Sequence, residues 1–187
     1  MGWTPEKSAH IFKVVLLGEA AVGKTTLVTS FLAGTTTKKS YSPTIGVEMR
    51  KKSLFIPDLN KEITLIIWDL AGQKTFEKTR PMFYAGAKGA ILVYDVTRPI
   101  TYEAVTLWLT ELYSALGKYV PAVLVGNKID LRYQNLGKVS PEEGESLSQR
   151  LSKQINHPVP FIEASALRNM NSDVPFVNLS KRMLDNS

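Results

Sequence analysis

The sequence predicts an α/β domain with a mostly parallel, six-stranded sheet flanked by helices. Two observations support this fold class. Short apolar runs alternate along the chain with longer helical patterns, which is typical of helices packed on a parallel sheet. The run Val14–Leu17 is apolar without interruption, and such runs form strands that are buried on both faces.

Each element has its own local signal. The polar stretch from Gly34 to Pro43 follows the first helical pattern and is long for a connection, which indicates a mobile or functional loop. Pro57–Asn60 separates two strand patterns and predicts a hairpin. Strands are expected over Ile11–Leu17, Gly46–Ile56, Ile63–Asp69, Gly89–Asp95, Pro121–Gly126 and Val159–Glu163. Helices are expected over Lys24–Leu32, Tyr102–Leu116, Pro141–Ile155 (after a capping box of Ser140 and Glu143) and about Val174–Leu184.

Length and composition limit the possible classes of protein. With 187 residues, 44% of them apolar, the chain fits one domain over residues 1–187 with a short N-terminal extension over residues 1–10. The lack of cysteine excludes disulfides, thiolate zinc sites, a catalytic cysteine and prenyl or palmitoyl anchors on these residues. No apolar run approaches the ~20 residues of a membrane-spanning helix, and no signal peptide is recognisable. We therefore expect a cytoplasmic protein, peripheral to a membrane only if a lipidated tail lies outside this sequence.

The net charge of +6 does not by itself indicate a nucleic-acid or lipid partner. Nucleic-acid-binding proteins concentrate such an excess in one stripe with interleaved aromatic residues, whereas here it is scattered. The densest cluster, Arg50–Lys52, favours a solvated strand end. No nucleic-acid partner is expected, and these residues do not support membrane association.

The segment Gly18–Thr25 matches the pattern G-x-x-x-x-G-K-[ST] between the first predicted strand and helix. Its glycines let the backbone bend so that N–H groups point at phosphate oxygens, and the helix N-terminus adds positive charge. In this pattern Lys24 reaches the β- and γ-phosphates and the Thr25 hydroxyl ligates Mg²⁺. The segment predicts a nucleoside-triphosphate site of the P-loop type.

A second motif, Asp69-Leu70-Ala71-Gly72-Gln73, ends the third predicted strand. A carboxylate at this position can hold Mg²⁺ directly or through water, so Asp69 is a candidate metal ligand. The backbone N–H of Gly72 can approach a γ-phosphate, and the Gln73 amide can orient an attacking water. The motif therefore predicts hydrolysis of the bound triphosphate.

The run Asn127-Lys128-Ile129-Asp130 follows the fifth predicted strand. The Asp130 carboxylate can accept hydrogen bonds from the guanine N1–H and 2-amino group, which adenine does not offer. Sites of this kind discriminate by roughly 10⁴-fold or more. The Lys128 stem can lie along the base, and Asn127 can tie this loop to the phosphate loop. After the last predicted strand, the N–H of Ala166 is placed to donate to the guanine oxygen.

In this order and spacing the motifs closely resemble those of the Ras superfamily of small GTPases, with the Rab branch nearest. The segments most similar to Rab proteins are Tyr41–Met49, Trp68–Gln73, Phe83–Ala87 and Leu92–Thr97, and the resemblance spans about Phe12 to Leu184. It implies a P-loop NTPase fold of the small G-domain type. It also implies that Thr44 ligates Mg²⁺ in the GTP state and releases it after hydrolysis.

Motifs and resemblance together define the candidate site. The metal ligands are expected to be Thr25, Thr44 and, through water, Asp69, and the catalytic residues Lys24, Thr44 and Gln73. The nucleotide-binding residues are expected to be Glu19, Ala20, Ala21, Val22, Gly23, Lys24, Thr25, Thr26, Thr44, Gly72, Asn127, Lys128, Asp130, Ser165, Ala166 and Leu167. By the resemblance, Met49, Trp68 and Phe83 would form an effector-docking surface, although such aromatic residues are more often part of a core.

The chain departs from the family pattern at several positions. Thr37 stands where an aromatic ring usually covers the guanine, which predicts faster nucleotide release. Ala20 and Ala21 stand at positions that are often glycine, so their methyl groups are expected to slow hydrolysis. Leu167 replaces a common lysine beneath the base, and no cysteine tail follows Leu184.

These features predict a monomeric molecular switch that binds GTP or GDP with Mg²⁺ and hydrolyses GTP slowly. It would signal to protein effectors through switch I (about residues 35–49) and switch II (about residues 70–84), in membrane trafficking. No arginine is recognisable as a built-in catalytic group, so an activating protein is expected to add about 10³–10⁵-fold, alongside an exchange factor. The alternatives are a GTP/GDP-binding interaction module with negligible hydrolysis and, disfavoured by Asn127–Asp130, an ATP-using P-loop kinase.

Overall fold

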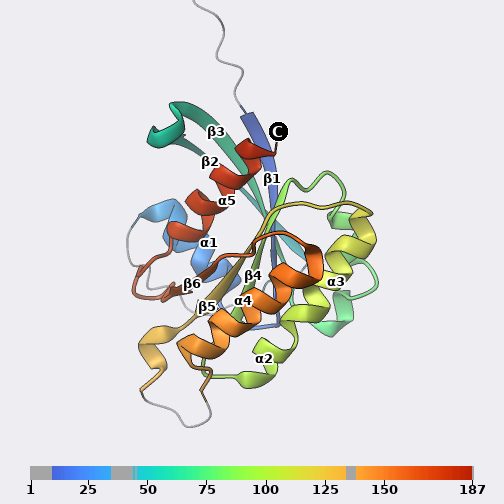
Figure 1. Cartoon of the computed structure of the whole chain (residues 1–187), viewed down its shortest axis with the longest axis vertical. Coiled ribbons are helices and arrows are strands. Elements are labelled where there is room, and N and C mark those ends of the chain that lie inside the picture. The colour runs from blue at the N-terminus through green and yellow to red at the C-terminus, as the bar shows by residue number, and fades with distance from the viewer. Residues whose placement is uncertain (1–9, 35–43, 45, 134–137, 187) are drawn as a thin grey trace, which may run out of the picture.

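The computed structural model describes residues 10–34, 44, 46–133 and 138–186. These residues contain a six-stranded sheet with the strand order β2-β3-β1-β4-β5-β6 (Figure 1). β2 pairs antiparallel with β3, and the other four pairings are parallel. The strands are β1 His10–Leu17, β2 Val47–Ile56, β3 Lys61–Leu70, β4 Gly89–Asp95, β5 Ala122–Asn127 and β6 Phe161–Ala164. The predicted fold class is confirmed.

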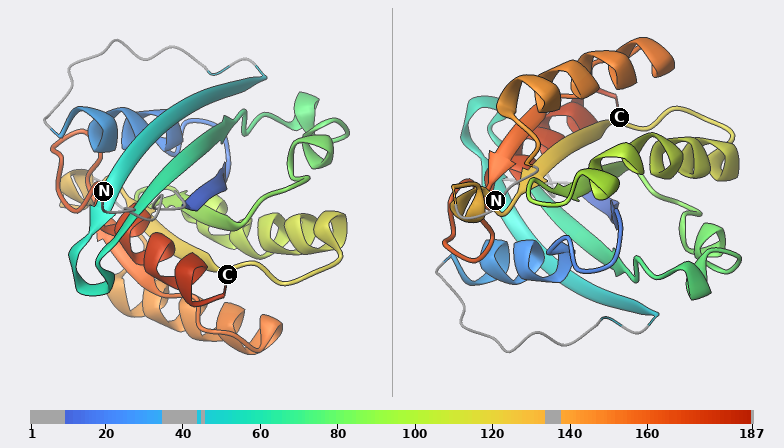
Figure 2. Two further views of the ribbon diagram at one scale, coloured as in Figure 1. Left: turned by 90° about the horizontal axis from the view of Figure 1, so that it is seen from above. Right: turned by 90° about the horizontal axis from the view of Figure 1, so that it is seen from below.

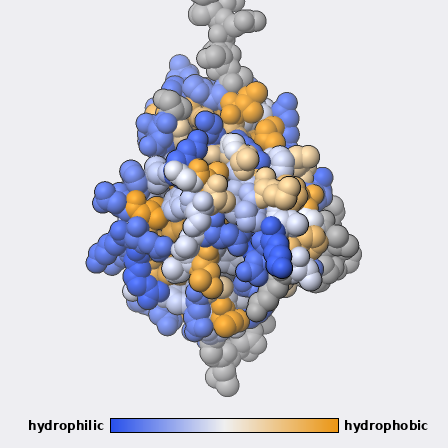
Figure 3. All heavy atoms as spheres, turned by 90° about the vertical axis from the view of Figure 1, so that its right-hand side faces the viewer, coloured by the Kyte–Doolittle hydropathy of each residue, from blue (hydrophilic) through white to orange (hydrophobic). Residues whose placement is uncertain are grey.

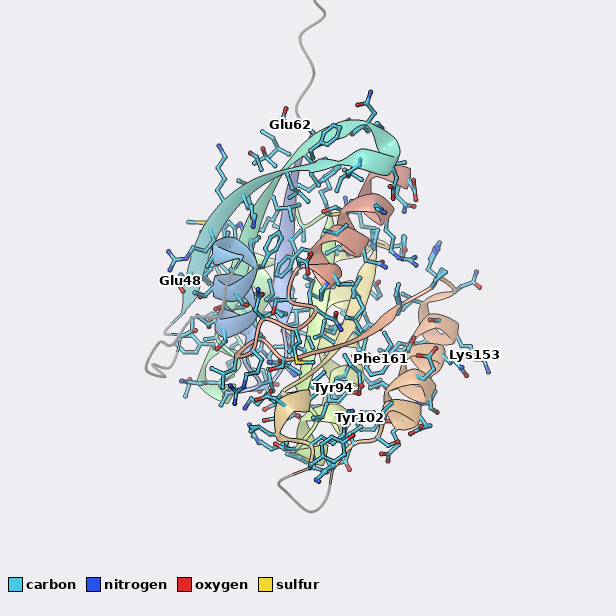
Figure 4. The ribbon with its side chains drawn as sticks, turned by 90° about the vertical axis from the view of Figure 1, so that its left-hand side faces the viewer. Glu48, Glu62, Tyr94, Tyr102, Lys153 and Phe161 are labelled. Atoms are coloured by element: carbon cyan, nitrogen blue, oxygen red, sulfur yellow. The ribbon has the colours of Figure 1, made fainter. Side chains whose placement is uncertain are left out.

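Most strand ends lie within one or two residues of the predicted ends. β6 begins at Phe161 rather than Val159, because Pro160 has no N–H to donate to the ladder. The predicted hairpin joins β2 to β3 through a short 3₁₀ turn, and Asn60 closes it in a left-handed conformation with φ of 49°. Figure 4 labels Glu48 and Glu62, which lie at opposite ends of this hairpin.

The helices are α1 Lys24–Ala33, α2 Pro99–Glu103, α3 Val105–Leu116, α4 Pro141–Ile155 and α5 Val174–Asp185. The capping box of Ser140 and Glu143 at the start of α4 is confirmed. The single helix predicted over Tyr102–Leu116 is wrong, because the helical run starts at Pro99 and is interrupted at Ala104. The hydroxyl of buried Thr101 accepts from the Asp95 N–H (3.0 Å), which ties the first turn to the end of β4.

Two apolar clusters fill the space on either side of the sheet. One contains side chains of α1 and α5, including Phe31, whose ring stacks on Phe176 at 4.0 Å. The other contains side chains of α3 and α4, including Trp108 and Leu147. In both views of Figure 2, β1 lies between α1 and α3. The sheet is therefore the middle of three layers.

This topology gathers the predicted motifs at one edge of the sheet. Strands β1, β3, β4 and β5 run in the same direction, so their carboxyl ends lie at a common edge. The loops that follow β1, β3 and β5 carry the three predicted motifs. Ligands of open α/β sheets bind at this edge.

Candidate functional site

The loop of residues 18–23, named here the phosphate loop, joins β1 to α1. Two of its glycines are required by space: a Cβ on Gly18 would lie 2.1 Å from a backbone oxygen of β4, and one on Gly23 would lie 2.3 Å from the Asn127 amide nitrogen. Ala21 has φ of 62°, a left-handed conformation that costs an L residue roughly 1–2 kcal/mol. The loop is therefore packed tightly against the ends of β4 and β5.

The side chain of Lys24, the first residue of α1, turns back into the phosphate loop. Its ammonium donates to the carbonyls of Gly18 (2.6 Å) and Glu19 (2.9 Å). Burial lowers the pKa of Lys24 to about 8, while the carboxylates of Asp69 and Glu19 act in the opposite direction. No carboxylate among the described residues forms an ion pair with this buried ammonium. A buried, unpaired cation favours binding of an anion such as phosphate.

Beside Lys24, three oxygen-bearing side chains from different parts of the chain meet. The Thr25 hydroxyl lies 2.7 Å from the Thr44 hydroxyl and donates to Oδ2 of Asp69. Asp69 is buried, and its Oδ1 has no hydrogen-bond partner among the described residues. Desolvation raises the pKa of Asp69, while its hydrogen bond from Thr25 and the charge of Lys24 act to lower it.

This oxygen cluster fits Mg²⁺. Hard oxygen ligands suit that ion, which usually keeps several waters and takes further oxygens from substrate phosphates. The described residues contain no group of three or more His, Cys, Asp or Glu side chains that could hold a metal. A cation here would bind the hydroxyls of Thr25 and Thr44 and, through water, the unpartnered oxygen of Asp69, with further oxygens from water and phosphate.

Gly72 and Gln73 follow β3 and lie against the phosphate loop. A Cβ on Gly72 would lie 2.4 Å from backbone atoms of Gly18 and Glu19, so no larger residue fits at this approach. Gln73 is half-buried at the start of switch II. Thr26, a further candidate, lies half-buried in the first turn of α1. The backbone at Gly72 is thus in direct contact with the phosphate loop.

The side chain of Asn127 connects the phosphate loop to the loop that follows β6. Its amide nitrogen donates to the Val22 carbonyl at 2.8 Å, and its amide oxygen accepts from the Ala166 N–H at 3.0 Å. The side chain is 1% exposed. The Ala166 N–H, which the sequence predicts to donate to guanine, here donates to Asn127.

The charged residues near Asn127 are oriented by partners that the motifs did not predict. The Lys128 ammonium donates to the Ala21 carbonyl and pairs with the buried carboxylate of Asp95, both at 2.7 Å. Oδ1 of Asp130 accepts from the Ser165 hydroxyl at 2.5 Å. Asp95 could have been found from its pattern, because it is the one charged residue in an otherwise apolar predicted strand.

Aromatic side chains support this loop from within the fold. The Tyr94 ring lies 5.5 Å from Tyr102 and 6.4 Å from Phe161, and Figure 4 shows the three near one another. A Cβ on Gly126 or Gly144 would lie 2.8 or 2.7 Å from the Tyr94 hydroxyl. The two glycines therefore make room for Tyr94 beneath the end of β5.

Several candidates lie farther from the phosphate loop or outside the described part. Thr37 belongs to the undescribed part of switch I, residues 35–43 and 45. Met49 is 59% exposed, whereas Trp68 and Phe83 are half-buried and pack against the cluster shared by α3 and α4. Leu167 is exposed.

The chain matches known proteins over most of its length. The model of the Ras family matches residues 13–185. Ras-related protein YPT3 of Nicotiana plumbaginifolia is 42% identical over 167 residues, 89% of this chain and 72% of that protein. Ras-related protein rab-11.1 of Caenorhabditis elegans is 37% identical over 96% of this chain and 80% of that protein. Ras-related protein Rab-11A of Dictyostelium discoideum is 36% identical over 93% of this chain and 76% of that protein. The chain belongs to the Ras family and is a Rab-like small GTPase, a switch that binds and hydrolyses GTP.

Proposed function

We propose that this GTPase is a Mg²⁺-dependent switch of membrane trafficking and that residues 1–187 form one GTPase domain. The Rab names of its relatives and its Rab-like switch segments support the trafficking role. A single-domain organisation is supported by the sheet, which all five helices of the described residues contact.

The phosphate groups of the nucleotide would lie in the phosphate loop, against the loop N–H groups and the ammonium of Lys24. This is the position where the protein presents an unpaired buried cation. Thr25 and Thr44 would hold Mg²⁺ directly, and Asp69 would hold it through water. When bound, the ion neutralises charge on the β- and γ-phosphate oxygens.

The guanine base would lie against the loop after β5. Asp130 accepts from the N1–H and 2-amino group, and the Ser165 hydroxyl fixes the orientation of that carboxylate. The alkyl stem of Lys128 lies along the base while its ammonium stays paired with Asp95. Ala166 and Leu167 complete the pocket on the β6 side.

Hydrolysis would be slow without a partner. Gln73 orients the attacking water, and the backbone N–H of Gly72 donates to a γ-phosphate oxygen. Phosphoryl transfer depends on positioning and on stabilisation of charge, and an activating protein that supplies an arginine adds about 10³–10⁵-fold. The site in this chain provides the positioning and leaves most of that acceleration to the partner.

The observation that carries this function is the double contact of Asn127, which joins the phosphate-binding and base-binding loops into one site. The test is to load the purified protein with GTP and Mg²⁺, remove the excess and follow bound nucleotide by chromatography. We expect GDP to appear over hours as GTP disappears. Persistent bound GTP would instead indicate an interaction module with negligible hydrolysis. Competition by ATP against labelled GDP, expected to be weak, tests the base preference.

Protein partners would bind at the two switches, with Met49 exposed near the start of β2. We expect effectors, an activating protein and an exchange factor, and no nucleic acid. We expect a monomer. On the face that carries α2 and α3, apolar side chains form small groups separated by polar ones (Figure 3), so this face offers no large apolar patch to a second copy. No helix among the described residues is long and apolar enough to cross a membrane. Affinity capture with the GTP-loaded and GDP-loaded protein, compared side by side, tests for partners that depend on the nucleotide.

A further inference from the structure

An arginine outside all the predicted motifs contacts the phosphate loop. Nη1 of Arg98, the residue before α2, donates to the carbonyl of Ala20 at 3.0 Å. The next two carbonyls along the loop accept from the ammonium of Lys128 (2.7 Å) and the amide of Asn127 (2.8 Å). Three successive peptide groups of the phosphate loop are therefore held by side chains that follow β4 and β5.

These contacts determine which way the loop N–H groups face. In a trans peptide the C=O and the N–H of the following residue point in opposite directions, and the described residues contain no cis peptide. The carbonyls of Ala20, Ala21 and Val22 point toward the three side chains, so the N–H groups of Ala21, Val22 and Gly23 point to the other side. None of these three N–H groups donates to a protein acceptor among the described residues. They are available to bind a phosphate.

The backbone N–H and carbonyl of Arg98 are both hydrogen-bonded. Its N–H donates to the Asp95 carbonyl at 2.9 Å, and its carbonyl accepts from both the N–H (2.9 Å) and the hydroxyl (2.8 Å) of Thr101. The Asp95 carboxylate in turn accepts from the N–H of Thr97 at 2.9 Å. The guanidinium forms no ion pair with a carboxylate of the described residues. The backbone of Arg98 is therefore held next to the phosphate loop by a hydrogen-bonded turn at the end of β4, and its exposed side chain reaches the Ala20 carbonyl from there.

The nearest acidic side chain of the loop has a different partner. The Glu19 carboxylate accepts from the indole N–H of Trp108 on α3 at 3.2 Å. Glu19 therefore does not pair with Arg98, and the Arg98 guanidinium donates to the backbone of the loop. The cation of Arg98 adds to the positive charge that Lys24 and Lys128 bring to this loop.

We propose that Arg98 is a positioning residue for GTP hydrolysis. It fixes the peptide between Ala20 and Ala21 so that the Ala21 N–H is presented to the phosphates, and its charge polarises that peptide and strengthens the N–H as a donor. Arg98 acts through the peptide and does not touch the substrate. The inference rests on the proposed function, in which the phosphates lie inside the loop.

The test compares Arg98→Ala and Arg98→Lys with the wild-type protein and with Lys153→Ala, which removes an exposed cation of α4. The readouts are single-turnover GTP hydrolysis and the phosphorus NMR spectrum of bound GDP. This hydrogen bond is exposed, so its loss predicts a modest effect, about three- to tenfold slower hydrolysis for Arg98→Ala. The phosphorus signals are expected to shift in this variant. Arg98→Lys, which keeps a cationic donor, is expected to recover most of the rate and the spectrum.

Two results would overturn the proposal. One is an Arg98→Ala protein with the rate and phosphorus spectrum of Lys153→Ala. The other is a loss of rate that Arg98→Lys does not recover and that accompanies a lower unfolding temperature, since that pattern describes a structural role. If the wild-type protein does not hydrolyse GTP, the proposed function fails by itself, and the spectrum of bound GDP still decides the role of Arg98.

Discussion

Asn127 and Val22 are 105 residues apart in sequence, and the Asn127 amide donates to the Val22 carbonyl at 2.8 Å. The same buried amide accepts from the N–H of Ala166. One side chain thus satisfies a carbonyl of the phosphate loop and an N–H of the loop after β6. Because both partners belong to the proposed nucleotide site, this amide couples the phosphate side of the site to the base side.

Replacing Asn127 by alanine is expected to speed GDP dissociation at least about tenfold. The change leaves a buried carbonyl at Val22 and a buried N–H at Ala166 without partners, at a cost of about 1–3 kcal/mol each. The release of a fluorescent GDP analogue measures the rate. Asn178→Ala on α5 is the control and should release at the wild-type rate. Equal rates for the two variants would show that Asn127 does not couple the two loops.

Ala21→Gly is expected to stabilise the GDP-bound protein by about 0.5–1 kcal/mol. Ala21 has φ of 62°, and glycine adopts this conformation without the penalty that an L side chain carries, a gain partly offset by the greater entropy of glycine in the unfolded chain. Thermal unfolding should show a midpoint higher by about 1–4 °C. Ala20→Gly is the matched control, because Ala20 does not have a positive φ and the same change there should lower the midpoint. A lower midpoint for Ala21→Gly would contradict the strain.

Those features of the fold that depend on local signals could be predicted from the sequence. β4 and α4 have their predicted ends, since an unbroken apolar run and a capping box mark them. The start of the helical run at Pro99, three residues before the predicted start, could not be predicted from periodicity, because its first turn is tied to the end of β4 by a hydrogen bond between Asp95 and Thr101. Local periodicity carries no information on such a contact.

The same distinction holds for the candidate site. The three motifs could be identified from spacing alone, but not the partners that orient them. Asp95 lies beside Asn127 because β4 and β5 pair in one register, and the pairing of Asp95 with Lys128 follows from that alignment. The hydrogen bond from Ser165 to Asp130 depends in the same way on the position of β6 beside β5.

The ionisation of Lys24 predicts opposite effects of pH on stability and on nucleotide affinity. Its pKa is lowered from 10.5 to about 8 in the folded protein, so between these values the unfolded chain binds more protons. The stability of the nucleotide-free protein is therefore expected to rise with pH across that window. GDP affinity is expected to fall above pH ~8, by up to about tenfold per pH unit, as the ammonium loses its charge.

Denaturant unfolding and GDP titration between about pH 7 and about pH 9 measure the two trends. Lys24→Arg is the control, because a guanidinium stays charged throughout this range. It also corrects for ionisation of the guanine base. Its affinity, whatever its absolute value, should depend less on pH than that of the wild-type protein. Parallel pH profiles for the two proteins would rule out Lys24 as the titrating group.

Gln73→Leu is expected to slow GTP hydrolysis at least about tenfold while leaving GDP affinity unchanged. Gln73 follows Gly72, whose backbone lies against the phosphate loop, so its amide is placed to orient a water near the terminal phosphate. Leucine has a similar volume and cannot hydrogen-bond that water. Single-turnover hydrolysis measures the rate, and Gln149→Leu on the exposed surface of α4 controls for loss of an amide elsewhere. Unchanged hydrolysis in Gln73→Leu would remove Gln73 from the mechanism and leave positioning of the water to the backbone of the two loops.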